Sequence, residues 1–227
     1  MDSIESSNLF ETTLARIRDA ICDGTLKPNE RLTQDKIAER LNVSRQPVNQ
    51  ALLLLKSQGF VVDAGRRGVM VAPISAERIA DIYEIRIVLD SLAARRAASR
   101  KLTDEEVENG RRVLAAGQQA LAQGSEGDLM RADVEFHRFV YKLSGNQFLC
   151  NIIDLHLDHL RRAMQAVIHA KSTMNYRSWT EHQAMFEALV AGDSMRAAEL
   201  SSVHMRNAAD LVRDVLLSTA GEAEVVN

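Results

Sequence analysis

The sequence predicts a mainly α-helical protein in two parts, with one short β-hairpin near residue 65. Apolar residues recur at spacings of three and four along most of the 227-residue chain, as they do on one face of an α-helix. Only three prolines and eleven glycines interrupt the chain. Two short β-branched runs bound a glycine-containing turn between residues 60 and 71, which predicts the hairpin.

Three helices are expected before the hairpin. The first spans Leu9–Cys22, and the second spans Thr33–Leu41 with its threonine as N-cap. The third begins after Ser44 and carries Pro47 in its first turn, where a missing N–H is harmless. A short second helix, a tight turn, a third helix and a hairpin together describe a winged helix-turn-helix.

Residues 75–227 show helical patterns and no strand pattern. We expect a boundary at residue 74, an all-helical bundle over 75–220 and a frayed tail over 221–227. Thr103 and Asp193 are suitable N-caps for two of its helices. The expected helices lie near 76–100, 103–123, 127–143, 147–171, 176–191 and 194–218.

Composition narrows the class of protein. No run of about 18 apolar residues indicates a membrane span, and the polar, acidic N-terminus does not resemble a signal peptide. Cys22 and Cys150 lie far apart and form no CxxC pair, which favours reduced, buried thiols and a cytoplasmic location, with a disulfide between them as the alternative. Residues 1–74 carry ten Lys/Arg and nine Asp/Glu, so DNA affinity would depend on a few positioned cations and on dimerisation.

The start of the third helix carries polar side chains that can read DNA bases. Arg can bridge guanine O6 and N7, and Asn or Gln can bridge adenine N6 and N7. The alternative is a solvated helix face and a basic loop, but the order of turn, polar face and basic hairpin favours DNA. The predicted DNA-contacting residues are Arg31, Thr33, Ser44, Arg45, Gln46, Asn49, Arg66 and Arg67.

The N-terminal part resembles the winged helix of the GntR family of regulators. The resemblance covers nearly all of residues 9–74 and rests on segments 26–32, 37–48, 59–60 and 67–69. The family usually has Gly at Asn29 and Arg-Glu at Asn49 and Gln50. Because that arginine contacts DNA in the family, Asn49 implies an altered operator preference or fewer phosphate contacts.

Four residues of the second part suggest a metal site. Asp133 and His137 lie four apart and therefore share a helix face, and His182 and His204 lie on later helices. One carboxylate and three imidazoles suit zinc, nickel, manganese or iron. Taken singly, each could equally be a hydrogen-bonded or surface residue.

The motifs around these residues resemble the FCD effector domain of the FadR-type branch of GntR regulators. The similar segments are 133–137 with 144–146, and 181–182 with 191–193, 197–198 and His204. The resemblance implies a divalent metal, namely zinc, nickel or manganese, bound by all four residues.

The segment 83–94 resembles the first helix of that domain. The resemblance implies that Arg86 faces the effector pocket, where it could hold a carboxylate through two parallel hydrogen bonds. The alternative is a salt bridge to Glu84, Asp90 or another helix. His156, His159 and His169 match no ligand position, and we expect them to be exposed or interfacial.

The resemblance implies a ligand-responsive regulator and not an enzyme. We expect a homodimer on palindromic double-stranded operator DNA, a small organic acid bridging the metal and Arg86, and repression relieved by that ligand. One alternative is a metal sensor in which the ion is the signal. A metal-dependent enzyme is a further alternative, against which there is no H-E-x-x-H motif and no evident base.

Overall fold

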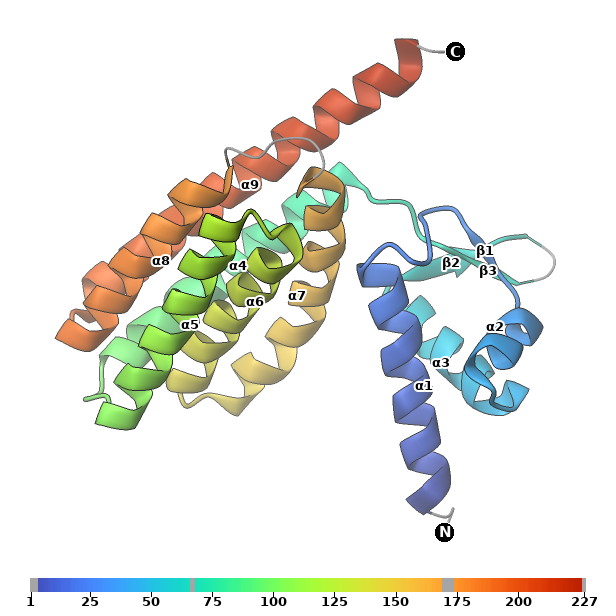
Figure 1. The fold of residues 1–227 in the computed structure, drawn as a ribbon, viewed down its shortest axis with the longest axis horizontal. Helices are drawn as coiled ribbons and strands as arrows, with labels where there is room; N and C mark the ends of the chain where they lie inside the picture. The colour runs from blue at the N-terminus through green and yellow to red at the C-terminus, as the bar shows by residue number, and fades with distance from the viewer. Residues whose placement is uncertain (1–3, 66–67, 169–173, 226–227) are drawn as a thin grey trace. The chain divides into compact units, whose positions relative to one another are not determined.

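The computed structural model describes residues 4–65, 68–168 and 174–225. The chain divides into two compact units, residues 1–74 and 75–227 (Figure 1). Mainly helical structure with a small antiparallel sheet in the first unit confirms the predicted fold class. In the part of the chain that is described, no helix is long and apolar enough to cross a membrane.

The first unit is a winged helix-turn-helix. As predicted, Thr33 caps the second helix, because its hydroxyl accepts a hydrogen bond from the Lys36 backbone N–H, and Pro47 is buried in the first turn of the third. Its three-stranded antiparallel sheet has the order β1-β3-β2. The described elements are α1 (Ile4–Cys22), β1 (Arg31–Leu32), α2 (Gln34–Leu41), α3 (Arg45–Ser57), β2 (Val61–Asp63) and β3 (Val69–Val71).

Two details of this unit differ from the sequence prediction. Helix α1 begins at Ile4, five residues before the predicted start. Strand β1 was not expected, because two residues are too few to show an alternating pattern. In this strand, Arg31 pairs with Met70 and Leu32 pairs with Val69 of β3. The pairing attaches the segment just before α2 to the hairpin.

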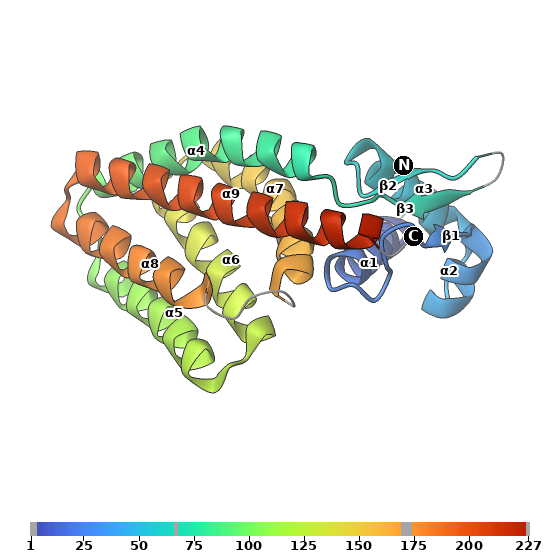
Figure 2. The same cartoon turned by 90° about the horizontal axis from the view of Figure 1, so that it is seen from above.

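The described residues of the second unit form helices only. Helices α4 and α9 lie side by side in both views, and α9 also contacts α8 (Figures 1 and 2). Helix α5 packs against α6 and α8, and α6 packs against α7. The helices are α4 (Ala76–Ala98), α5 (Asp104–Gln123), α6 (Glu126–Leu143), α7 (Gln147–Ile168), α8 (Met174–Ala191) and α9 (Ser194–Val225).

The expected helix end at residue 218 and tail over 221–227 are wrong for the described backbone. Helix α9 continues to Val225. One glycine, Gly221, is followed by Glu222, Ala223 and Glu224, which have good helix propensity, so the glycine does not end the helix. The predicted N-caps Thr103 and Asp193 are confirmed, since each accepts a backbone N–H three residues later.

Small residues let α5 approach α8 closely. A Cβ atom built at Gly117 would lie 1.4 Å from the Trp179 ring, and one built at Gly110 would lie 2.1 Å from the Phe186 ring. The Trp179 indole donates a hydrogen bond to the Leu114 carbonyl oxygen at 3.1 Å. These contacts hold α8, the helix that carries His182, against α5.

Candidate metal centre and DNA-contacting helix

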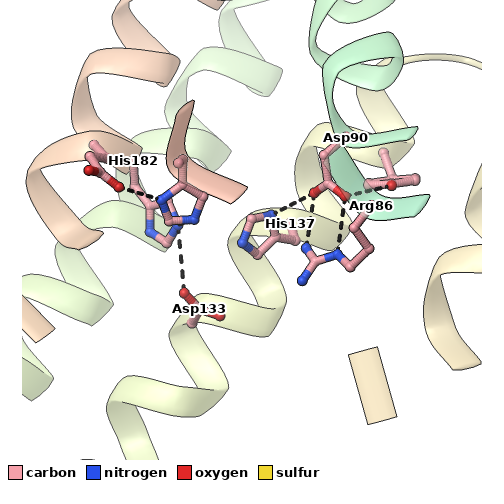
Figure 3. A network of polar contacts seen from close by, with 8 residues as sticks. Arg86, Asp90, Asp133, His137 and His182 are labelled. Carbon is pink, nitrogen blue, oxygen red and sulfur yellow. Dashed lines mark hydrogen bonds and ion pairs between the residues drawn. The ribbon is translucent and has the colours of Figure 1, made fainter. Parts of the chain in front are cut away.

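The four predicted metal ligands meet inside the helical unit. Asp133 and His137 come from α6, His182 from α8 and His204 from α9, and their ligand atoms lie within 4.8 Å of one another. His182, His204 and His137 are 0, 2 and 4% exposed. Figure 3 shows Asp133 pointing toward His182, whose Nε2 lies 3.6 Å from Asp133 Oδ1.

Glu181 orients the His204 ring. Its Oε2 atom lies 2.7 Å from His204 Nδ1, and its Oε1 atom accepts a hydrogen bond from Asn207 at 2.7 Å. Because an ionised carboxylate only accepts, Nδ1 carries the proton and Nε2 keeps its lone pair. That lone pair faces His182 Nε2 at 3.1 Å, where a proton or a cation is needed between the two nitrogens.

Asp90 orients the His137 ring in the same way. Its Oδ1 atom lies 3.2 Å from His137 Nδ1, which leaves Nε2 available as a ligand atom. Asp90 also accepts hydrogen bonds from Arg86 Nη2 and Nε at 3.0 and 3.1 Å and from the Tyr141 hydroxyl at 2.9 Å (Figure 3). A carboxylate that orients a metal-binding imidazole is the usual outer partner of a metal ligand.

Burial keeps two of the imidazoles, those of His137 and His182, in the form that binds metals. Burial, with the nearby positive charge of Arg86, lowers the pKa of His137. Burial lowers the pKa of His182 well below its usual value, and His204 and His137 lower it further. These two rings are therefore neutral at neutral pH, with lone pairs free for a cation.

Aromatic side chains hold the His182 ring. It stacks on Phe136 at a centroid distance of 4.2 Å and meets Trp179 edge-on at 4.8 Å. With both rings packed against it, the imidazole has a fixed plane, and its Nε2 atom is held toward His204 and Asp133. Three imidazoles, two of them with a fixed tautomer, and one carboxylate fit a divalent cation of the zinc, nickel or manganese type.

Arg86 lies beside this group but is already paired. It is 3% exposed and makes a two-pronged ion pair with Asp90, which is the salt bridge weighed as an alternative. Burial of Asp90 alone would raise its pKa, but Arg86 and His137 hold that pKa well below its usual range. Nη1 of Arg86 makes no hydrogen bond among the described residues.

The other histidines do not join the group. His159 is 6% exposed, so the expectation of an exposed or interfacial residue is wrong for it. Helix α7 contacts α4, α6 and α9 and therefore buries more than one stripe of side chains. His156 is half-buried, and burial, with the charge of Arg86, lowers its pKa. His169 lies outside the described residues.

The start of α3 presents an exposed polar face. Ser44, Arg45, Gln46 and Asn49 are all exposed. The Ser44 hydroxyl makes no capping hydrogen bond, so the first amides of α3 remain available for a phosphate. Arg45 pairs with Asp35 at 2.5 Å, and Asn49 accepts a hydrogen bond from Gln34 at 2.8 Å.

Two of the four remaining predicted DNA-contacting residues, Arg31 and Thr33, lie just before α2. Arg31 is exposed and donates a hydrogen bond to the Ala64 carbonyl oxygen, which ties β1 to the hairpin. The Thr33 hydroxyl is engaged at the start of α2. Arg66 and Arg67 lie outside the described residues.

Sequence reasoning missed the carboxylates that orient the ligands. Glu181 had a signal, because it directly precedes His182, and Asp90 had one, because it lies four residues after Arg86. Neither signal indicates which imidazole the carboxylate contacts, since both contacts cross between helices.

Two family models match the chain. Residues 9–71 match the model of bacterial regulatory proteins, gntR family, and residues 81–207 match the model of the FCD domain. The uncharacterized HTH-type transcriptional regulator YdhC of Bacillus subtilis is 27% identical over 209 residues, which cover 88% of this chain and 89% of that protein. The HTH-type transcriptional repressor NanR of Cronobacter sakazakii is 28% identical over 222 residues, which cover 88% and 83%.

Solved structures share the fold. E. coli McbR/YncC matches with a TM-score of 0.79 at 22% identity over 93% of this chain and 98% of that one. A GntR-type transcriptional regulator from Rhodococcus sp. RHA1 matches with a TM-score of 0.75 at 22% identity, over 89% and 96%.

Proposed function

The chain belongs to the GntR family of transcriptional regulators, in the branch with a C-terminal FCD domain, and from this premise we propose how it is controlled. Its relatives are regulators of transcription and not enzymes. We propose that the FCD domain binds a divalent metal and a small organic acid, and that this ligand changes the affinity of the winged helix for operator DNA.

The convergence of Asp133, His137, His182 and His204 carries the metal proposal. Four donors from three helices meet in the interior, and two of the imidazoles receive their orientation from carboxylates. A structural role alone would not require three buried histidines around one carboxylate. When bound, the ion would supply a fixed positive charge and, if six-coordinate, two positions for ligand oxygens.

Arg86 supports an acidic effector. Its Nε and Nη2 atoms are used by Asp90, while Nη1 makes no hydrogen bond within the described part of the chain. A carboxylate reaching Nη1 and the outer edge of Nη2 would gain charge-assisted hydrogen bonds without breaking the Asp90 pair. An acid that bridges this edge of the Arg86 guanidinium and the ion would therefore bind both.

The exposed face of α3 supports operator binding. Arg45, Gln46 and Asn49 can contact base edges, and the amides after Ser44 can contact a phosphate. We propose a cytoplasmic homodimer that reads a palindromic operator, since two-fold symmetry in the protein requires it in the DNA. Repression that the ligand relieves is the mode we propose, in keeping with NanR of Cronobacter sakazakii, which is a transcriptional repressor.

Elemental analysis of protein purified without added metal or chelator tests the site. We expect about one ion per chain in the wild type and none in the combined Asp133/His137/His182/His204→Ala variant, with both remaining folded by circular dichroism. His156→Ala is the matched control, because it removes a half-buried histidine outside the group. A wild type that stays metal-free after incubation with zinc, nickel and manganese would contradict the proposal.

The Arg86–Asp90 ion pair favours a second candidate, in which the metal itself is the signal. Because Asp90 already neutralises the charge of Arg86, an acid would gain less by binding the remaining edge of the guanidinium. The two candidates separate when operator affinity is measured with metal alone and with metal plus a panel of small di- and hydroxycarboxylic acids. A response to the ion without any acid supports the metal sensor.

A further inference from the structure

Two exposed contacts join the start of α2 to the exposed polar face of α3. Gln34 Nε2 donates a hydrogen bond to Asn49 Oδ1 at 2.8 Å. Arg45 Nε lies 2.5 Å from Asp35 Oδ1. All four side chains are exposed, and Arg45 and Asn49, four residues apart, lie on the same face of α3. Two successive residues of α2 thus hold two side chains that can reach base edges.

The hydrogen bond from Gln34 restricts the orientation of the Asn49 amide. The terminal torsion of a free asparagine is broad and roughly two-fold, so its oxygen and its NH2 group can exchange places. Here the oxygen faces the Gln34 donor, and turning the Asn49 amide alone would bring two NH2 groups together. Asn49 therefore turns only if Gln34 turns as well, and the two side chains form a coupled amide pair.

The edge of the Asn49 amide that remains matches adenine better than the other bases. A carbonyl oxygen has two lone pairs, so the bond to Gln34 leaves Oδ1 one lone pair and leaves Nδ2 both of its N–H groups. One donor beside one acceptor fits adenine, which presents the N7 acceptor and the N6 donor in the major groove. Guanine presents two acceptors, thymine one acceptor and cytosine one donor, so each of them satisfies only half of the amide.

We propose that Gln34 is a positioning residue for operator recognition, which holds Asn49 so that α3 selects an adenine at one position of each half-site. The inference rests on the proposed function, because it specifies part of the operator that the winged helix would bind. Asn49 stands where the GntR family usually has an arginine, so a neutral donor and acceptor replace a positive charge. The amide pair supplies the operator preference that this departure implies.

Stability gives little reason for this amide pair. Both side chains are exposed, and a hydrogen bond between exposed neutral groups competes with bonds to water on nearly equal terms. Ordering two flexible side chains also costs conformational entropy in the free protein. The same ordering is an advantage on DNA, because a side chain that is already fixed loses less freedom on binding. Changing Gln34 should therefore alter base selection and leave the free energy of unfolding unchanged.

Selection from a random-sequence duplex DNA library tests the proposal in the full-length protein. The wild type should select half-sites with an adenine for which Asn49→Ala loses discrimination by about 5–150-fold. Gln34→Leu should weaken the same discrimination by about 2–10-fold, the cost of immobilising one free side chain, with preferences at the other positions retained. Glu39→Leu places the same side chain at another exposed position of α2 and should keep the adenine preference.

A double variant separates positioning from an independent effect of Gln34. If Gln34 acts through Asn49, adding Gln34→Leu to Asn49→Ala should change base selection no further. An additional change in the double variant, an unaltered adenine preference in Gln34→Leu, or another base at the position that depends on Asn49 would each overturn the proposal. So would a loss of thermal stability in Gln34→Leu, which would show a structural role instead. A wild type that selects no sequence, with or without bound metal, would overturn operator binding as well.

Discussion

Asp90 shows at the scale of single residues how the metal group and Arg86 are connected. One buried carboxylate accepts hydrogen bonds from Arg86, Tyr141 and His137, so each donor depends on the position of the others. A change at Arg86 would therefore reach His137, one of the candidate metal ligands, through the Asp90 carboxylate. This connection gives the proposed effector a direct means to alter the metal site.

The Arg86–Asp90 pair should behave as a coupled unit. Asp90→Asn leaves the guanidinium charge buried without a counter-charge and should lower the free energy of unfolding by about 3–5 kcal/mol. In the double variant with Arg86→Met, no charge is left unpaired, so the loss should be smaller than the sum of the two single losses by at least about 1 kcal/mol. Urea denaturation of the metal-free protein measures these quantities, and additive losses would contradict the coupling.

Glu181 should tune metal affinity without forming part of the ligand set. In Glu181→Gln, the neutral amide accepts the His204 Nδ1–H less strongly, and we expect metal affinity to fall about 10–100-fold. Glu187→Gln makes the same change on the exposed side of α8, where Glu187 accepts a hydrogen bond from Gln183, and should leave affinity unchanged. Competition with a chromophoric chelator distinguishes the two, and equal affinities would exclude an orienting role for Glu181.

Residue patterns predicted some of the site directly and some only through resemblance. The four-residue spacing of Asp133 and His137 places them on one helix face, which the structure confirms. Nothing in local spacing links them to His182 or His204, since tertiary packing alone joins α6, α8 and α9. Asn29 shows a further limit. Its φ of 66° lies in the region that favours glycine, which is the residue that the family usually has there. The sequence pattern alone did not predict this backbone conformation.

At the scale of elements, turns and caps were predictable because their signals are local. Thr33, Pro47, Thr103 and Asp193 mark helix starts in the sequence and in the structure. Strand β1 was not predictable, because its two residues become a strand only through pairing with β3. The close approach of α5 and α8 was also invisible, since nothing in the sequence pairs a particular glycine with Trp179.

Gly117 should be essential for the packing of α5 on α8. In Gly117→Ala, the new methyl group would overlap the Trp179 ring, and we expect a loss of about 1–3 kcal/mol in the free energy of unfolding. Metal affinity should fall as well, because Trp179 contacts His182. Gly127→Ala is the control, since its added Cβ would lie 3.9 Å from its nearest neighbour and should stabilise α6 slightly. Thermal unfolding that ranks the two variants the other way would refute the packing argument.

At the scale of the whole molecule, metal binding should stabilise one unit only. All four candidate ligands lie within residues 75–227, and none lies within residues 1–74. Calorimetry of the full chain should therefore show a transition that rises with metal concentration, by about 2.7 kcal/mol of stability at 100 times Kd, beside one that does not move. The combined alanine variant should lack the response, and a rise of both transitions would contradict a site confined to the second unit.

The burial of the metal ligands also has a kinetic consequence. The three histidines are almost completely covered, while the Asp133 side chain is 27% exposed and forms the one solvent-facing part of the group. Among the described residues, an ion bound there would leave past that carboxylate or after the helices separate, so its residence time should depend on opening of the bundle. An ion retained across many cycles of operator binding and release would not signal rapid changes, which would leave that role to the proposed acid.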